Sequence, residues 1–138
     1  MWHRYWSNRL LAMRRNGILV TTRQVRYRKT EIPLSDGQIK SVVTAQEKGI
    51  DVRIALDIVR MARQDQLDVA VVFSQDQDLA EVAAEVKDIA RASGRWIKIV
   101  SAFPAGQNAT SSRGINGTDW FKMNEEFYNN CLDPKDFR

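Results

Sequence analysis

Three aspartates and a serine have the types and spacing of residues that could do chemistry on a phosphate. Asp76 and Asp78 share a polar loop with Ser74, directly after an apolar run, and Asp51 stands at the start of a predicted helix. Oxygen ligands of this kind suit hard divalent cations such as Mg²⁺ and Mn²⁺. A bound divalent cation can activate water and neutralise the charge of a phosphate in transit. The pattern therefore indicates a candidate metal site.

Each aspartate also has a simpler structural explanation. Asp51 and Asp78 lie at the starts of predicted helices, where a carboxylate can accept free backbone N–H groups, and for either residue alone capping is the better explanation. Asp76 caps no predicted helix, so the combination favours a site. Asp57 lies about 240° around the helix from Asp51 and does not share its face.

The cysteine and histidine content excludes several other chemistries. The 138 residues include a single cysteine, Cys131, and a single histidine, His3. One cysteine cannot form an intrachain disulfide, and the two residues together cannot build a Cys/His zinc site, which takes three or four such ligands. Histidine-dependent triads are disfavoured for the same reason. Catalysis would have to rely on carboxylates, and a metal on oxygen ligands.

Basic residues concentrate near the N-terminus. The net charge is +4, and residues 1–30 hold eight Lys or Arg and no acid. Together with nearby aromatics this suits a polyanion with stackable bases, although a solvated basic face with aromatics turned to the core is by itself the more common explanation. The charge split raises nucleic acid above other partners but does not by itself establish it. The candidate nucleic-acid-binding residues are Arg23, Arg26, Arg28, Lys29 and Lys48.

Targeting signals are not evident. The longest central apolar run, 69–73, is far shorter than the ~20 residues of a membrane span, and residues 1–6 lack the apolar region of a secretory signal. We expect a cytoplasmic protein with no membrane partner.

Hydrophobic periodicity predicts alternating strands and helices after residue 50. Such alternation indicates a parallel sheet covered by helices, whose functional crevice lies at the carboxyl ends of the strands. The strand 68–73 has the composition of one buried on both faces. The predicted elements are a helix 2–15, a strand 18–28, a loop 29–47 with a short helical turn at 38–45, a helix 51–64, the strand 68–73, a helix from Leu79 to Ser93, a strand 96–103, a loop 104–118 and a last strand or short helix within 119–131.

Three segments resemble motifs of NYN-domain proteins, which belong to the wider PIN-like ribonuclease group. The run 47–57 (EKGIDVRIALD) is similar to the family's "KGxDv…l..D", and the run 72–79 (VFSQDQDL) is similar to "vSxDxDf". The later run 117–121 (GTDWF) resembles the closing "aD.f". The resemblance covers about residues 18–125.

The resemblance implies a three-layer PIN-like α/β sandwich with a mainly parallel central sheet flanked by helices. It implies one domain over residues 1–131, with a tail at 132–138, and RNA cleavage that depends on Mg²⁺ or Mn²⁺. By matching to the motifs, Asp51, Asp76 and Asp78 are the catalytic and metal-binding acids, and Ser74 is the hydroxyl beside them. Asp119 and Asp57 are further candidates.

The sequence departs from the family at its N-terminal end. NYN domains begin with a central strand ending in Asp-Gly-x-Asn, which supplies an acidic ligand, whereas no Asp or Glu precedes Glu31 here. We therefore expect an N-terminally shortened version that lacks the first central strand and is weak or inactive as a nuclease. The open sheet edge would leave backbone groups unpaired and favour pairing with another chain, including a homo-oligomer.

Three functional hypotheses follow. The first is a metal-dependent ribonuclease that hydrolyses RNA phosphodiester bonds. The second is a catalytically incomplete RNA- or partner-binding module that keeps the NYN fold, which the missing first acid favours. The third is a receiver-like phosphotransfer domain, which is weak because Lys98 lies inside its predicted strand rather than near its end.

Overall fold

A computed structural model of the chain describes residues 2–33, 37–109 and 111–134. The chain divides into two compact units, residues 1–49 with 133–138 and residues 50–132. Among the described residues, no helix is long and apolar enough to cross a membrane.

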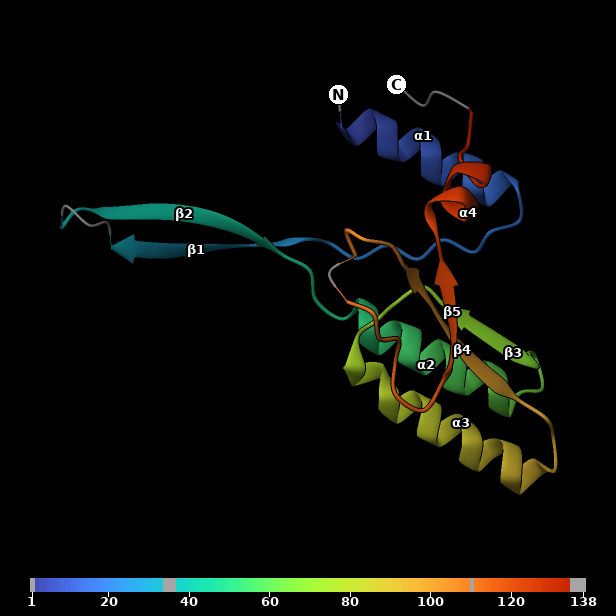
Figure 1. Ribbon diagram of the computed structural model, residues 1–138. Helices are drawn as coiled ribbons and strands as arrows, with labels where there is room; N and C mark the ends of the chain where they lie inside the picture. The colour runs from blue at the N-terminus through green and yellow to red at the C-terminus, as the bar shows by residue number, and fades with distance from the viewer. Residues whose placement is uncertain (1, 34–36, 110, 135–138) are drawn as a thin grey trace. The chain divides into compact units, whose positions relative to one another are not determined.

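The first unit begins with the predicted amphipathic helix. Helix α1 spans Trp2–Arg15 (Figure 1), which confirms the prediction for residues 2–15. It ends where Gly17 adopts a φ of +80°, a left-handed conformation that glycine takes without the steric cost of a side chain. The amides of Asn16 and Ile18 donate back to carbonyls of the last turn and close the helix.

The first unit also contains a two-stranded antiparallel ribbon. Strand β1 spans Arg26–Pro33 and strand β2 spans Ile39–Gln46, and they pair from Arg26 opposite Gln46 to Pro33 opposite Ile39. The predicted strand 18–28 is therefore wrong for residues 18–25, which find no strand partner among the described residues. The predicted loop 29–47 with its helical turn is also wrong, because the β-branched residues of 39–44 pair with β1 instead.

The second unit contains a parallel sheet. Its three strands lie in the order β3-β4-β5, with Val69 opposite Lys98 and Val100 opposite Asp119. This confirms the predicted parallel sheet and the alternation of strands and helices. The elements are α2 (Ile50–Arg63), β3 (Val69–Val72), the 3₁₀ turn η1 (Gln77–Leu79), α3 (Ala80–Ser93), β4 (Lys98–Pro104), β5 (Asp119–Met123) and α4 (Glu125–Asn130).

The core of the second unit lies between the sheet and helices α2 and α3. Ala62 of α2 and Val86 of α3 are each only 1% exposed, and they pack with the inward-facing residues of β3 and β4. The buried cluster consists of Ala62, Ala70, Val72, Leu79, Val82, Ala83, Val86, Ile97, Ile99 and Ile115.

The other face of β3 is exposed. Only Ala70 and Val72 of this strand are buried, whereas Val71 is 52% exposed and the following Phe73 is 74% exposed. The prediction that this strand is buried on both faces is therefore wrong. A parallel strand is buried on both faces only where both are covered, and α2 and α3 pack on the face that carries Ala70 and Val72.

Candidate functional site

The loop that follows the carboxyl end of β3 carries two of the candidate acids, Asp76 and Asp78. Two hydrogen bonds from backbone amides to side chains define its conformation. The Asp76 side chain caps η1, since its Oδ1 accepts from the Asp78 amide at 3.0 Å. The Ser74 hydroxyl oxygen in turn accepts from the Asp76 amide at 3.1 Å. The prediction that Asp76 has no capping role is therefore wrong. The Asp76 side chain caps the start of η1, and the Ser74 hydroxyl holds the Asp76 backbone amide.

The other two acids do not take the predicted capping positions. Asp78 lies in the first turn of η1, two residues after the cap. Asp51 is the second residue of α2, inside its first turn. Both side chains are exposed. A carboxylate in a first turn is still stabilised by the positive end of the helix dipole.

The three aspartates do not form a ligand cluster. Over the described ranges, no group of three or more His, Cys, Asp or Glu side chains could hold a metal ion. The predicted convergence of Asp51 with Asp76 and Asp78 is therefore not found as a metal-binding cluster among the described residues; Asp51 lies on α2, and the other two acids lie on the loop. Two carboxylates remain on that one loop. Mg²⁺ is commonly bound through one or two carboxylates and several waters, so this donor set fits a water-rich magnesium site.

Asp57 and Asp119 are held in ion pairs. Both carboxylate oxygens of Asp57 are bonded, one to Arg53 Nε at 2.7 Å and one to Arg60 Nη2 at 2.8 Å. The hydrogen bond from Arg53, together with the positive charges of both arginines, lowers the pKa of Asp57 below its ordinary value. Asp119 accepts from Lys98 Nζ at 2.7 Å at the amino end of β5, whereas Asp76 follows the carboxyl end of β3. Asp119 thus lies at the opposite edge of the parallel sheet from the loop, and Asp57 lies on α2 with both carboxylate oxygens paired.

Two glutamines brace the acidic loop, and neither was predicted from the sequence. Gln75 Nε2 donates to the carbonyl of Arg113 at 2.7 Å. Gln77 Nε2 donates to the carbonyl of Gly114 at 3.0 Å, and Gln77 Oε1 accepts from the Asn116 amide at 3.1 Å. No local pattern in the sequence pairs these glutamines with the segment 113–116, because their partners lie 37 to 39 positions away.

A buried serine anchors the same loop to the sheet. Ser101 of β4 has no exposed surface, and its hydroxyl donates to the carbonyl of Ser74 at 2.6 Å. Beside it, a Cβ on Gly114 would lie 2.7 Å from Trp120 Cδ1 and 2.8 Å from Ser101 Oγ. Glycine is required at 114 so that the segment 113–116, which binds the two glutamines, can approach the sheet this closely.

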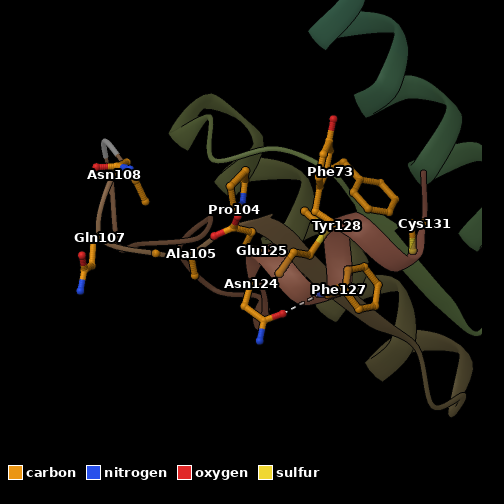
Figure 2. A pocket seen from close by; sticks show the side chains of 13 residues that line it. Phe73, Pro104, Ala105, Gln107, Asn108, Asn124, Glu125, Phe127, Tyr128 and Cys131 are labelled. Carbon is orange, nitrogen blue, oxygen red and sulfur yellow. Dashed lines mark hydrogen bonds between the residues drawn. The ribbon is translucent and has the colours of Figure 1, made fainter. Parts of the chain in front are cut away.

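A cavity of about 730 Å³ opens at the carboxyl edge of the sheet. Figure 2 shows the aromatic side chains of Phe73, Phe127 and Tyr128 gathered on one side of it, with Gln107 and Asn108 on the other. Glu125 is its one carboxylate among the described lining residues, so this cavity offers no multidentate metal site. The cavity walls are mainly apolar, and Phe73, the residue that follows β3, is one of the residues that line the cavity.

The candidate nucleic-acid-binding residues all lie in the first unit. Arg23 precedes β1, while Arg26, Arg28 and Lys29 belong to it; Lys48 follows β2. All five side chains are exposed. They are accessible to a polyanion, but they do not share one face of the ribbon.

A family model for the NYN domain matches residues 4–121, which include the acidic loop, strands β3 and β4, and β5 as far as Phe121. The chain belongs to the NYN domain family and so to the PIN-like nucleases. No match is found in a search of curated proteins or in a search of solved structures.

Proposed function

We propose that this protein is a ribonuclease that hydrolyses RNA phosphodiester bonds with a divalent cation, Mg²⁺ or Mn²⁺, held by Asp76 and Asp78. The observation that carries the proposal is the acidic loop itself, in a member of a nuclease family. It follows a parallel strand at the sheet edge where α/β folds place their functional crevice, and it is tied to the neighbouring segment through Gln75 and Gln77.

The loop residues have distinct roles in this proposal. Asp78 and the Asp76 oxygen that does not cap η1 would bind the cation, which supplies charge neutralisation and water activation at the phosphate. Ser74 would hold the Asp76 backbone in place through its hydroxyl. Asp51 would not be a ligand of the cation in this proposal, and would lie near the substrate instead.

A fuller sheet belongs to the same proposal. Parallel sheets are normally covered on both faces, and the exposure of Val71 and Phe73 supports a third layer over that face. Strand β3 lies at the edge of the order β3-β4-β5, where a further strand could pair with its backbone. A second copy of the chain is one way to supply that strand.

The experiment is an RNA cleavage assay with Mg²⁺, Mn²⁺ or EDTA. Asp76→Asn should abolish the metal-dependent cleavage because the substitution removes a ligand charge. Asparagine is as good an N-cap as aspartate, so the variant should keep its stability. Asp88→Asn is the matched control, since Asp88 is an exposed acid on α3 paired only with Arg91 among the described residues. Cleavage by Asp76→Asn at the wild-type rate would refute the site.

The second candidate function is an RNA-binding module without catalysis. The absence of a three-carboxylate cluster among the described residues favours it. In the same assay this function predicts RNA binding with no metal-dependent cleavage by the wild-type chain.

A further inference from the structure

The pairing of β1 with β2 sorts their charged residues onto two different faces. Residues directly opposite one another in an antiparallel pair share a face, and successive residues alternate between faces. Arg26 and Arg28 therefore share one face with Lys40, which lies opposite Ile32. We call this the cationic face. Its residues are Arg26, Arg28, Thr30 and Ile32 of β1 and Lys40, Val42, Thr44 and Gln46 of β2.

The opposite face has a different character. Lys29 and Glu31 are two residues apart on it, so a cation and an acid lie close together there. Its other exposed side chains include Tyr27, Ile39 and Val43. The cationic face carries three cations and no acid, so the register concentrates positive charge on one side only.

The cations of this face are available for a ligand. Among the described residues, neither Arg26 nor Arg28 nor Lys40 forms an ion pair, although ion pairs are frequent in the second unit. At ~3.3 Å per strand residue, the six steps from Arg26 to the level of Lys40 span about 20 Å. Thr30, Thr44 and Gln46 on the same face add hydroxyl and amide groups that can form hydrogen bonds with phosphate or sugar oxygens.

We propose that the cationic face of the β1–β2 ribbon is an RNA-binding surface that contacts the backbone of a single strand through Arg26, Arg28 and Lys40. Complementarity of charge argues for this occupant. Proteins that bind an A-form duplex contact two successive minor grooves and the phosphates between them over about 16 base pairs, which is longer than the ~20 Å of this face. A single strand laid along the ribbon is therefore the RNA that we assign to it. The choice of RNA rests on the proposed function, but the face is assigned by register alone.

The test compares neighbouring charge reversals on opposite faces. Arg28→Glu and Lys29→Glu change the net charge equally, one residue apart, yet their side chains lie on different faces. Binding of a fluorescent single-stranded RNA of mixed sequence is measured in EDTA, so that cleavage cannot interfere. The salt concentration is about 0.15 M, where charges farther apart than ~8 Å are largely screened.

Arg28→Glu should weaken binding about tenfold or more. Lys29 was a candidate from the sequence, but the register places it outside the cationic face, so this proposal removes it from the binding surface and Lys29→Glu should weaken binding no more than about threefold. Lys40→Glu, on the other strand, should behave like Arg28→Glu. The slope of log K against log salt should become shallower by about 0.7 for each phosphate that the variant no longer binds. Arg28→Gln repeats the test without a new negative charge, and circular dichroism checks that each variant folds.

Equal losses of affinity in Arg28→Glu and Lys29→Glu would overturn the assignment, as would tighter Arg28-dependent binding to anionic phosphatidylserine vesicles or to duplex DNA. Cleavage that depends on Asp76 but not on Arg28 would overturn the ribbon surface and leave the nuclease proposal standing. Arg28-dependent binding without any cleavage would support the ribbon surface and count against the nuclease.

Discussion

Removal of the Ser101 hydroxyl should loosen the acidic loop at a measurable cost in stability. Ser101→Ala deletes the 2.6 Å hydrogen bond to the Ser74 carbonyl without adding atoms. Because Ser101 is fully buried, water cannot readily replace the missing donor. The acceptor belongs to Ser74, which is half-buried, so the expected cost is that of a typical intramolecular hydrogen bond, about 0.5–1.5 kcal/mol. We expect the free energy of unfolding to fall by that amount in urea titrations of the full chain.

Ser93→Ala is the matched control for this prediction. Ser93 also donates a short hydrogen bond, at 2.7 Å to the Ile89 carbonyl, but it is exposed on the last turn of α3. Solvent can take over that bond, and exposed substitutions of this kind usually change stability by ~0.5 kcal/mol or less. The two variants remove the same atoms. Because alanine also has the higher helix propensity, Ser93→Ala should lose still less stability than the exposure of its hydroxyl alone predicts.

The second readout of Ser101→Ala is local. If the hydroxyl anchors the loop, backbone amides of 74–79 should exchange hydrogen faster in Ser101→Ala while those in the middle of α3 change less. Any metal-dependent cleavage should fall as well, because ~1 Å of misplacement can cost on the order of 100-fold in rate. Equal stability losses in Ser101→Ala and Ser93→Ala, with unchanged exchange in the loop, would refute this reasoning.

Further predictions concern a close approach, a cap and an ion pair. Gly114→Ala should destabilise the protein by about 1–3 kcal/mol through overpacking, whereas Gly106→Ala should not, since a Cβ there would meet nothing within 4 Å; urea titration compares them. Asp76→Ala should cost about 0.5–2 kcal/mol through removal of the cap, while Asp76→Asn stays near wild type. The pKa of Asp57 is lowered chiefly by its hydrogen bond from Arg53, so its stabilising effect is present above the ordinary carboxyl pKa and is lost as the pH falls through the lowered value. Thermal melts should show Asp57→Asn less stable than wild type at pH 7, with the difference shrinking as the pH falls below the ordinary carboxyl pKa.

Asp76 has two candidate roles, as the cap of η1 and as a ligand of the cation. Two different substitutions are needed to tell these roles apart. One carboxylate oxygen is committed to the Asp78 amide, so the residue shapes the loop even when no cation is bound. Asparagine keeps that acceptor and removes the charge, while alanine removes both. A comparison of these two variants therefore distinguishes a ligand from a cap.

The amino-acid sequence by itself determined the elements whose signals are local. Helical periodicity predicted α1 over residues 2–15 and α2 over 51–64, each within one residue of its observed bounds. Alternation of strands and helices predicted the parallel sheet. The spacing of the acidic motifs pointed to the family that matches over residues 4–121. These signals are repeated over consecutive residues, so they do not depend on knowing which segments meet.

Only the tertiary structure decided which residues act on one another across long separations. Ser101 and Ser74 are 27 positions apart, and Gln77 and Gly114 are 37 apart, so no local pattern pairs them. The ribbon register joined Lys40 to Arg28 and separated Lys29 from it, because a pleated strand turns adjacent side chains to opposite faces. The exposure of Val71 likewise depended on which face of the sheet α2 and α3 cover, a choice that a run of apolar residues does not encode.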